Sequence, residues 1–370
     1  MEYKVPFVNY PEHYRRMWGD VTGAISEVLS QGDLILRGQL KQLEENIASF
    51  VGVKYAVGVS SGTDALYLSL KAAGVGPGDE VITVAHTFVA TVAAIVHCGA
   101  KPILIDIGED MNMDVGQLER TISPKTKVVI PVHLNGRLCD MKKLIKIADQ
   151  HGLIVIEDAA QALGASLDGK KAGSFGLTGC FSFYPAKILG AAGDGGILVT
   201  NNEEILEKIR LLRNHGVQRT TGDILSYGFN SRLDNLQAAI LNMKLKHLPM
   251  WIGRRRELAS LYHQGLSTLP YLTLPPPPNA QDGFYDVYQN YVVRAEKRNQ
   301  LVTHLRESGI ETLISWPKPM HYHKALGLGH FHLPMTEQIS KEVLSLPLYP
   351  ELSNEQLKYA IESVHDFYNK

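Results

Sequence analysis

The run Ile154-Val155-Ile156-Glu157-Asp158 joins a short apolar strand to two carboxylates at its carboxyl end. Similar runs recur between about residues 50 and 200, and helix-like segments separate several of them. Near-continuous apolar strands that alternate with helices are typical of a largely parallel sheet covered on both faces. The strands predicted in this way are Ala56–Val59, Val81–Val84, Pro102–Ile107, Val128–Leu134, Leu153–Glu157, Cys180–Tyr184 and Ile197–Thr200.

Helices are predicted between several of these strands. The last two strands are joined by a Gly-rich loop that leaves no room for a helix, so we expect mixed strand direction there. The predicted helices of this region are Ala65–Ala73, Ala90–His97 and Met141–Gln150.

The pattern changes after about residue 201. Four prolines, Pro275–Pro278, predict a stiff extended spacer. We predict a large domain over residues 1–249 and a small α+β domain over 250–370, with the N-terminal segment packing on the small domain. The elements predicted here are helices Glu203–Asn214, Leu233–Leu248, Arg298–Ser308 and Asn354–Tyr368, and a strand at Tyr288–Val293.

The composition is that of an ordinary globular chain of 370 residues, with 45% hydrophobic residues and 37 Lys and Arg against 38 Asp and Glu. This balance argues against a nucleic-acid-coating surface. Neither a signal-peptide core at Met1–Val5 nor a membrane-spanning stretch is found, so we expect a cytoplasmic protein without membrane contact. Cys98, Cys139 and Cys180 lack CxxC spacing, which argues against disulfides and structural zinc.

Two features at strand ends predict a phosphate-bearing cofactor with a ring nitrogen. In Ser60-Ser61-Gly62-Thr63-Asp64, small residues open a helix, so Gly62 and Thr63 are candidate phosphate donors. A plain helix cap by Ser61 or Asp64 is the alternative. Asp158 could hold the ring nitrogen of pyridoxal phosphate (PLP) protonated, and Gln161 could bond its ring hydroxyl. Strand-end capping is the alternative for Asp158.

Lys187 ends the aromatic strand Phe181-Ser182-Phe183-Tyr184 and precedes a Gly-rich turn. A lysine enclosed by apolar groups has a lowered pKa, as a Schiff-base amine requires, although a single strand-end lysine is usually solvated. Ser182 could add a hydroxyl to the phosphate site. The glycines lead into another strand without GxGxxG spacing, which argues against a dinucleotide-binding dehydrogenase.

Phe88, in the segment Thr87–Thr91 after strand Val81–Val84, could stack on a flat ring, with a core position as the alternative. Taken together, the motifs resemble the DegT/DnrJ/StrS family of sugar-nucleotide aminotransferases. The matching segments cover nearly the whole chain: Ser60–Leu66, Pro77–Val84, Thr87–Thr91, Pro131–Asp140, Glu157–Ala165, Phe181–Gly196, Arg213–Gly216, Asn230–Ala239 and Val343–Pro350.

The resemblance implies the fold type I of PLP-dependent enzymes: an α/β fold with a mixed, mostly parallel seven-stranded sheet, helices on both faces and a smaller C-terminal α+β domain. It also implies a homodimer with both active sites at the interface. The site residues that it implies are catalytic Lys187 and Asp158, then Gly62, Thr63 and Ser182 for phosphate, Phe88 and Gln161 for the ring, Asn230 for the partner's phosphate, and His321 near the substrate.

The activity implied is transfer of an amino group, with glutamate as donor, to a dTDP-, UDP- or GDP-linked 3- or 4-keto-sugar. The mechanism would be ping-pong, through a Lys187 aldimine and pyridoxamine phosphate (PMP). Some family members are dehydrases with histidine at the lysine position, so Lys187 favours amino transfer. Leu134-Asn135-Gly136 and Asp33–Gly38 depart from the commoner family forms, which leaves the sugar open.

Two alternatives to the aminotransferase stay open. A PLP-dependent sugar dehydrase and a non-catalytic regulatory protein of the same fold are the rival functions. A metal site at His321, His323, His330 and His332 is disfavoured because no carboxylate cluster is nearby, so we expect no metal. The tract Arg254-Arg255-Arg256 is interpreted as a solvated helix face, with pyrophosphate binding as the second hypothesis.

Overall fold

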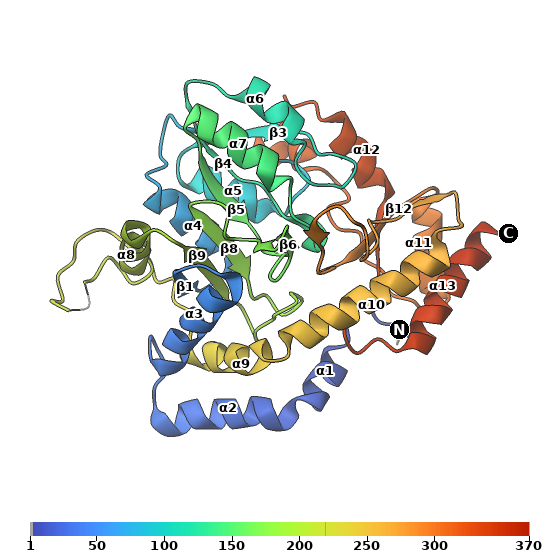
Figure 1. The fold of residues 1–370 in the computed structure, drawn as a ribbon, viewed down its shortest axis with the longest axis horizontal. Helices are drawn as coiled ribbons and strands as arrows, with labels where there is room; N and C mark the ends of the chain where they lie inside the picture. The colour runs from blue at the N-terminus through green and yellow to red at the C-terminus, as the bar shows by residue number, and fades with distance from the viewer. Residues whose placement is uncertain (1–2, 219, 370) are drawn as a thin grey trace.

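The computed structural model describes residues 3–218 and 220–369 and builds them around one large sheet (Figure 1). Within these residues the sheet has seven strands in the order β1-β9-β8-β5-β4-β2-β3. Strand β9 is antiparallel to both β1 and β8, and the other neighbouring pairs are parallel. The mostly parallel sheet and the change of direction are confirmed. The bounds are β1 Tyr55–Val59, β2 Glu80–Val84, β3 Lys101–Ile105, β4 Thr126–Val129, β5 Ile154–Asp158, β8 Thr178–Ser182 and β9 Gly196–Thr200.

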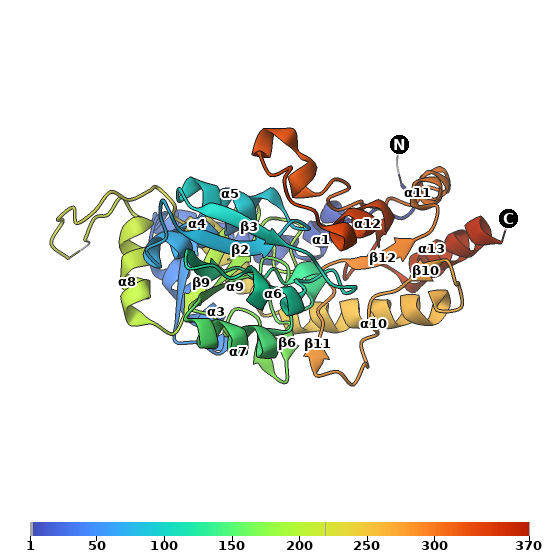
Figure 2. The ribbon, with the colours of Figure 1, turned by 90° about the horizontal axis from the view of Figure 1, so that it is seen from above.

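Helices cover both faces of the sheet because successive strand residues point to opposite sides. Ile156 and Cys180 pack with helices α4, α5 and α8, whereas their neighbours Val155 and Phe181 pack with α3, α7 and α9. Figure 2 shows α4 and α5 on one side of the sheet and α6 and α7 on the other. The bounds are α3 Gly38–Val51, α4 Gly62–Ala72, α5 Val89–His97, α6 Leu118–Thr121, α7 Met141–His151, α8 Glu203–Leu212 and α9 Asn235–Leu245.

Strand β4 is shorter than the sequence predicts. It ends at Val129, so the prediction of a strand to Leu134 is wrong. Pro131 has no N–H to donate to a ladder, and Asn135 has a left-handed backbone with φ of 57° inside a 3₁₀ turn, Leu134–Gly136. The chain still lies beside β5, because Asp158 N–H donates to the Pro131 carbonyl at 2.9 Å.

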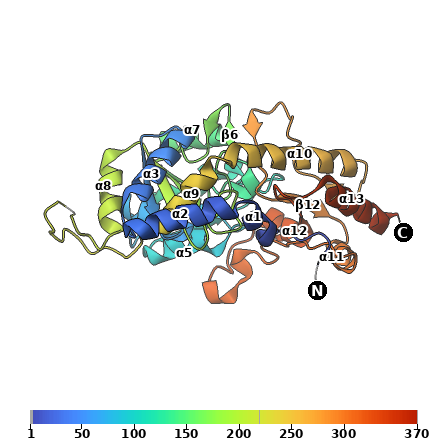
Figure 3. The same cartoon turned by 90° about the horizontal axis from the view of Figure 1, so that it is seen from below.

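The N-terminal helices α1 (Tyr10–Arg16) and α2 (Trp18–Gln31) were not predicted from the sequence. Helix α2 packs against α9, as Figure 3 shows. Val5 lies farther away, in a hydrophobic cluster with residues between 258 and 364, where it forms a parallel bridge with Ile310. The N-terminal segment therefore connects the large sheet with the C-terminal part of the chain.

The C-terminal part has its own sheet, of order β10-β12-β13, and its own hydrophobic cluster. The long helix α10 begins at Leu248 and runs from the large sheet toward this part (Figure 1), so the proposed domain boundary near residue 250 falls inside a helix. The remaining elements are β6 Ser166–Leu167, β7 Lys170–Lys171, α10 Leu248–Leu266, β10 Leu272–Thr273, β11 Phe284–Tyr285, β12 Tyr291–Ala295, α11 Arg298–Glu307, α12 Pro334–Glu342, β13 Val343–Leu346 and α13 Asn354–Tyr368, with short 3₁₀ turns at Val115–Gln117, Met320–Tyr322 and Lys324–Leu326.

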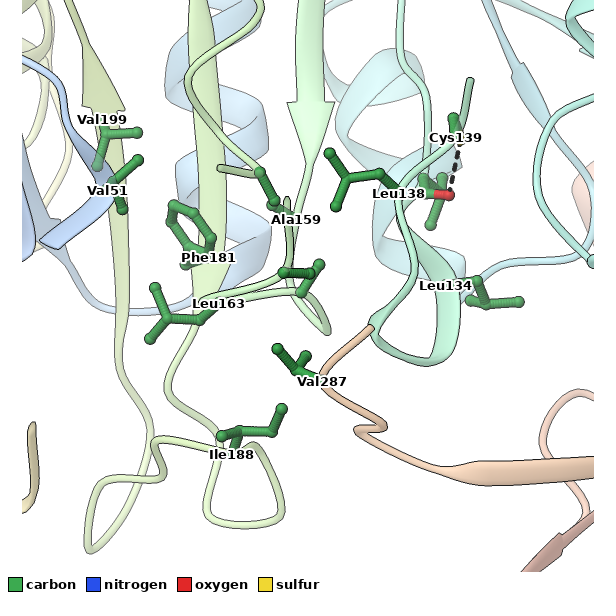
Figure 4. Close-up of a cluster of buried hydrophobic side chains, with 14 of the residues drawn as sticks. Val51, Leu134, Leu138, Cys139, Ala159, Leu163, Phe181, Ile188, Val199 and Val287 are labelled. Atoms are coloured by element: carbon green, nitrogen blue, oxygen red, sulfur yellow. Dashed lines mark hydrogen bonds between the residues drawn. The ribbon is translucent and has the colours of Figure 1, made fainter. Parts of the chain in front are cut away.

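A buried hydrophobic cluster underlies the carboxyl ends of β5 and β8 (Figure 4). Val287 enters this cluster from the segment before β12 and lies near Ile188 and Leu163. Cys139 is also buried here, and its thiol donates to the Val132 carbonyl at 3.2 Å. Three segments that are far apart in the sequence thus meet directly beneath the strand ends.

Among the described residues, every helix is too short or too polar to cross a bilayer.

Glu157 is a fully buried carboxylate that holds the strand β5 end to the following loop. It accepts hydrogen bonds from the backbone N–H groups of Gly173, Phe175 and Gly176 at 2.7 to 2.8 Å. His133 Nε2 lies 3.0 Å from Glu157 Oε2, the oxygen that also accepts Gly173 N–H. Cys139 N–H donates to His133 Nδ1, so Nε2 carries the proton. Glu157 is therefore a structural anchor, which leaves Asp158 to face the opposite way.

Replacing Glu157 by alanine should destabilise the fold strongly, because three buried or half-buried N–H groups lose their acceptor. We expect Glu157→Ala to lower the free energy of unfolding by about 3 kcal/mol or more, measured by urea denaturation. Glu204→Ala on the solvent side of α8 is the control and should change little. A Glu157→Ala protein as stable as this control would contradict the anchoring role.

Candidate active site

Asp158 points away from the Glu157 anchor and toward the start of α5. Its carboxylate accepts a hydrogen bond from the Thr91 hydroxyl at 2.7 Å and one from Ala160 N–H at 3.2 Å. Burial raises the pKa of Asp158 above its ordinary value, and these hydrogen bonds offset part of the rise. The carboxylate is held rigidly in a place where a cationic ring nitrogen would stabilise its charge.

Lys187 follows β8 and is half-buried in the turn that begins at Tyr184, whose carbonyl accepts Lys187 N–H at 2.8 Å. Burial lowers the pKa of the Lys187 amine, and the charge of nearby Asp158 offsets part of that shift. The amine thus has access to its neutral form, which is the nucleophilic form. It lines a small hollow with Tyr10, His13 and Lys244.

The proposed phosphate site lies at the start of α4. Ser61 caps this helix by accepting Asp64 N–H at 3.1 Å, as the capping hypothesis predicted, and α4 begins at Gly62 rather than near Ala65. Among the described residues, the N–H groups of Gly62 and Thr63 have no acceptor. A Cβ on Gly62 would lie 2.8 Å from the Cβ of Ser182, so the structure brings these two residues together.

Phe88 precedes α5 and exposes 60% of its surface, so the core alternative is wrong. An open aromatic face beside the buried Asp158 can stack on a flat ring. The segment is tied to Asp158, because Thr87 and Thr91 share a hydrogen bond of 2.8 Å and Thr91 donates onward to Asp158.

Gln161 is held by the Leu134–Gly136 turn. Its side-chain oxygen accepts Asn135 N–H at 2.7 Å. Its amide nitrogen has no acceptor within the part of the chain that is described, and remains available to donate to a ring hydroxyl. Asn135, which differs from the commoner family form of this loop, is therefore hydrogen-bonded to the side chain that is proposed to contact the ring.

Asn230 is exposed. It pairs with Asn214 at the base of the segment after α8, and it lines a hollow of about 410 Å³ with Thr63. Its neighbour Ser231 donates to Asp64 at 2.8 Å. Asn230 and Thr63, which lies at the start of α4, thus line the same hollow.

His321 is buried, and its Nε2 lies 3.1 Å from Glu337. The neighbouring Met320 N–H donates at 3.3 Å to the carbonyl of Ala85, which begins the loop that carries Phe88. In the described residues no group of three or more His, Cys, Asp or Glu side chains is arranged as a metal site. His321 is therefore linked to the Phe88 loop through the backbone.

The arginine tract is neither a solvated face nor an open anion site. Arg255 is buried, with its pKa lowered to about 10 by burial, and donates to the carbonyls of Tyr288, Gln289 and Leu348. Arg256 donates to the carbonyl of Asp286. The tract joins α10 to backbone carbonyls, so both interpretations of it are wrong.

Three side chains that contact Asp158 or the turn after β8 were not predicted from the sequence: Thr91, Lys244 and Gln289. Thr91 had a usable signal, because it lies in the first turn of the helix predicted after strand Val81–Val84, on the segment that carries Phe88. Lys244 and Gln289 had none. Lys244 is buried, burial lowers its pKa to about 8, and its amine donates to the Gly190 carbonyl at 2.5 Å.

The residues present fit PLP. The unpaired N–H groups of Gly62 and Thr63 suit a phosphate, and the cradle beside Ser182 would be filled by a Cβ at position 62. Asp158 suits the ring nitrogen, Lys187 the aldehyde, and Phe88 the ring face. The fold and site together define a PLP-dependent aminotransferase of fold type I.

The chain belongs to the DegT/DnrJ/EryC1/StrS aminotransferase family, whose model matches residues 18–365. It is 43% identical to a "pleiotropic regulatory protein" of Geobacillus stearothermophilus, with 98% of both chains covered. It is 41% identical to a UDP-N-acetyl-3-dehydro-α-D-glucosamine 3-aminotransferase of Acidithiobacillus ferrooxidans, with 95% of each covered.

Two solved structures share the fold. DesV of S. venezuelae, in complex with a ketimine intermediate, is 40% identical with a TM-score of 0.95, and both chains are covered fully. NtdA of Bacillus subtilis, with bound cofactor PMP, is 32% identical with a TM-score of 0.90, over 98% of this chain and 83% of that one. The large sheet and the C-terminal part are thus shared as one arrangement.

Adding a methyl group at position 62 should weaken cofactor binding. In Gly62→Ala the new Cβ would press on Ser182, and we expect about a 10-fold weaker affinity for PLP, measured by absorbance titration of the cofactor-free protein. Gly76→Ala is the matched control, because its Cβ would meet nothing within 4 Å. Equal affinities of the two variants would count against the phosphate site at Gly62.

Proposed function

We propose that the protein transfers an amino group from glutamate to a nucleotide-linked keto-sugar, with PLP held at Lys187. The observation that carries the proposal is that Lys187 follows β8 and Asp158 ends the neighbouring strand β5, near enough for their charges to interact, in a member of an aminotransferase family. A relative of the same length is named for a UDP-linked 3-keto-sugar. We therefore propose a 3-keto nucleotide sugar as the first substrate to test.

Bound PLP would supply an electron-poor ring that stabilises negative charge at the carbon beside the amino group. Lys187, freed from the cofactor, would take the proton from that carbon and deliver it to the cofactor carbon, since burial gives it a lowered pKa. Asp158 would keep the ring nitrogen protonated, and Phe88 and Gln161 would orient the ring. The keto acid leaves before the sugar enters, which makes the kinetics ping-pong.

The donor and the sugar are expected to use one site in turn. His321 is proposed to lie near the sugar, because its segment is bonded to the start of the Phe88 loop. A non-catalytic regulatory role is the second candidate, favoured by the name of one relative. The complete set of cofactor residues favours the enzyme, and Lys187 in place of histidine disfavours a dehydrase.

Glutamate should bleach the visible absorption band of the PLP-loaded protein, and a 3-keto nucleotide sugar should restore it while an amino-sugar accumulates. Lys187→Ala should fold, as judged by circular dichroism, and lose at least about 10³-fold in turnover, because one group moves the proton in each half-reaction. Mass spectrometry of the products of 3-keto and 4-keto substrates distinguishes the position. A loaded wild-type protein that no amino donor bleaches would support the dehydrase or regulatory function instead.

We further propose a homodimer in which the segment after α8 reaches the partner. This segment projects from the body of the chain (Figures 1 and 2). Its large apolar side chains are exposed: Ile224 by 75%, Leu225 by 57% and Tyr227 fully. Exposed apolar groups on one projecting segment favour coverage by another protein surface. Asn230, at the base of the segment, is proposed to bind the phosphate of the partner's cofactor.

Mixing two impaired variants tests this arrangement. If Asn230 acts across the interface, hybrids of Lys187→Ala and Asn230→Ala contain one site with both residues intact. Refolding the two variants together should then restore activity in these hybrids, measured against each variant refolded alone. If Asn230 serves its own chain, every site in the hybrid lacks one residue and activity stays at the level of the separate variants.

A further inference from the structure

Gln289 makes two hydrogen bonds that flank Lys187 on both sides along the backbone. Its side-chain oxygen accepts Ile188 N–H at 2.8 Å, and its amide nitrogen donates to the Ala186 carbonyl at 2.8 Å. If the Gln289 amide were flipped, its NH₂ group would face Ile188 N–H and its oxygen would face the Ala186 carbonyl. The two hydrogen bonds therefore also fix the orientation of the amide. Both peptide groups next to Lys187 are thus held by one side chain about a hundred positions later in the chain.

The backbone of Gln289 is held independently of its side chain. Arg255 donates to the carbonyls of Tyr288 and Gln289 at 3.2 Å. Val287 N–H donates to the Gly136 carbonyl at 3.0 Å, and a Cβ on Gly136 would lie 2.8 Å from Gln289 N. The segment is therefore docked even when the amide of Gln289 is replaced.

The same segment connects Lys187 to the turn that holds Gln161. Asn135 N–H bonds Gln161, and its neighbour Gly136 bonds Val287, two residues before Gln289. Val287 and Ile188 lie in one buried cluster (Figure 4). A displacement of Gln289 would thus move the lysine relative to the Gln161 side of the site.

We propose that Gln289 is a positioning residue that sets where the Lys187 amine stands relative to Asp158 and to the reacting atoms. The proposal rests on the proposed function for its catalytic consequence, whereas the effect on Lys187 itself can be measured in the cofactor-free protein. If the wild-type protein has no transaminase activity, the proposed function is wrong, but the effect of Gln289 on Lys187 can still be measured in the cofactor-free protein.

Gln289→Met removes both hydrogen bonds at nearly constant size. In the cofactor-free protein we expect hydrogen exchange at Ile188 N–H to accelerate, and the pH midpoint for acetylation of Lys187 to move upward as the amine becomes less enclosed. In the loaded enzyme we expect kcat to fall by about 10- to 100-fold, with KM for the donor within about twofold.

Gln289→Glu provides the rescue. A protonated carboxyl carries one donor and one acceptor, as the amide does, so the kcat of this variant relative to wild type should recover as the pH is lowered. When the carboxyl introduced by Gln289→Glu ionises at higher pH, both of its oxygens are acceptors and one of them faces the Ala186 carbonyl. The recovery of kcat should therefore be lost at higher pH. A pH-independent ratio would contradict the positioning role.

Gln237→Met is the matched control, because the Gln237 side-chain oxygen accepts Ala192 N–H at 2.9 Å in the same turn, five residues beyond Lys187. It should leave exchange at Ile188 and the Lys187 midpoint unchanged. If it alters both as strongly as Gln289→Met does, the two glutamines merely order the turn and the proposal is overturned. An unchanged Lys187 midpoint in Gln289→Met would overturn it as well.

Discussion

The burial of an amine and a carboxylate close together at the carboxyl edge of the sheet is the constraint around which the site is built. Removing either charge from water costs several kcal/mol unless partners compensate for it. Asp158 accepts hydrogen bonds from Thr91 and from the backbone N–H of Ala160. For Lys187, the charge of nearby Asp158 offsets part of the cost of burial. A cofactor with a cationic ring nitrogen and an aldehyde would satisfy both groups. Without such a ligand the two groups are incompletely compensated, so the site lowers the stability of the fold in exchange for cofactor binding.

Structural anchors keep this pair in place from several directions. Glu157 collects three backbone N–H groups and so turns its neighbour Asp158 toward α5. The turn after β8 is held by Gln289 and by Lys244. The Leu134–Gly136 turn links Gln161 to the segment that carries Gln289. Gln161 and the backbone around Lys187 are therefore joined by one connected set of hydrogen bonds, so a change in the Leu134–Gly136 turn can displace both.

Much of the fold followed from local patterns, and much of the site depended on combining them. Apolar runs such as Ile154–Asp158 marked the strands because a strand covered on both faces is apolar throughout. The apolar run continues beyond Val129, so the sequence predicts a longer strand there than the structure has. Pro131 and the left-handed backbone of Asn135 end the hydrogen bonding of β4, although most of the residues that follow Val129 are apolar. Lys187 and Asp158 were identified from strand ends together with a family resemblance. Gln289 could not be identified from the sequence, because its partners lie about a hundred residues earlier and the residues around it form no motif.

The central claim is that Lys187, rather than another amine, carries the cofactor. Lys244 is the informative competitor, since it is buried in the same hollow with its pKa lowered to about 8. Borohydride reduction of the PLP-loaded protein, followed by mass spectrometry of its peptides, reads out the attachment site directly. The account predicts one added phosphopyridoxyl group on the peptide that contains Lys187. Attachment at Lys244, or at no lysine, would contradict it.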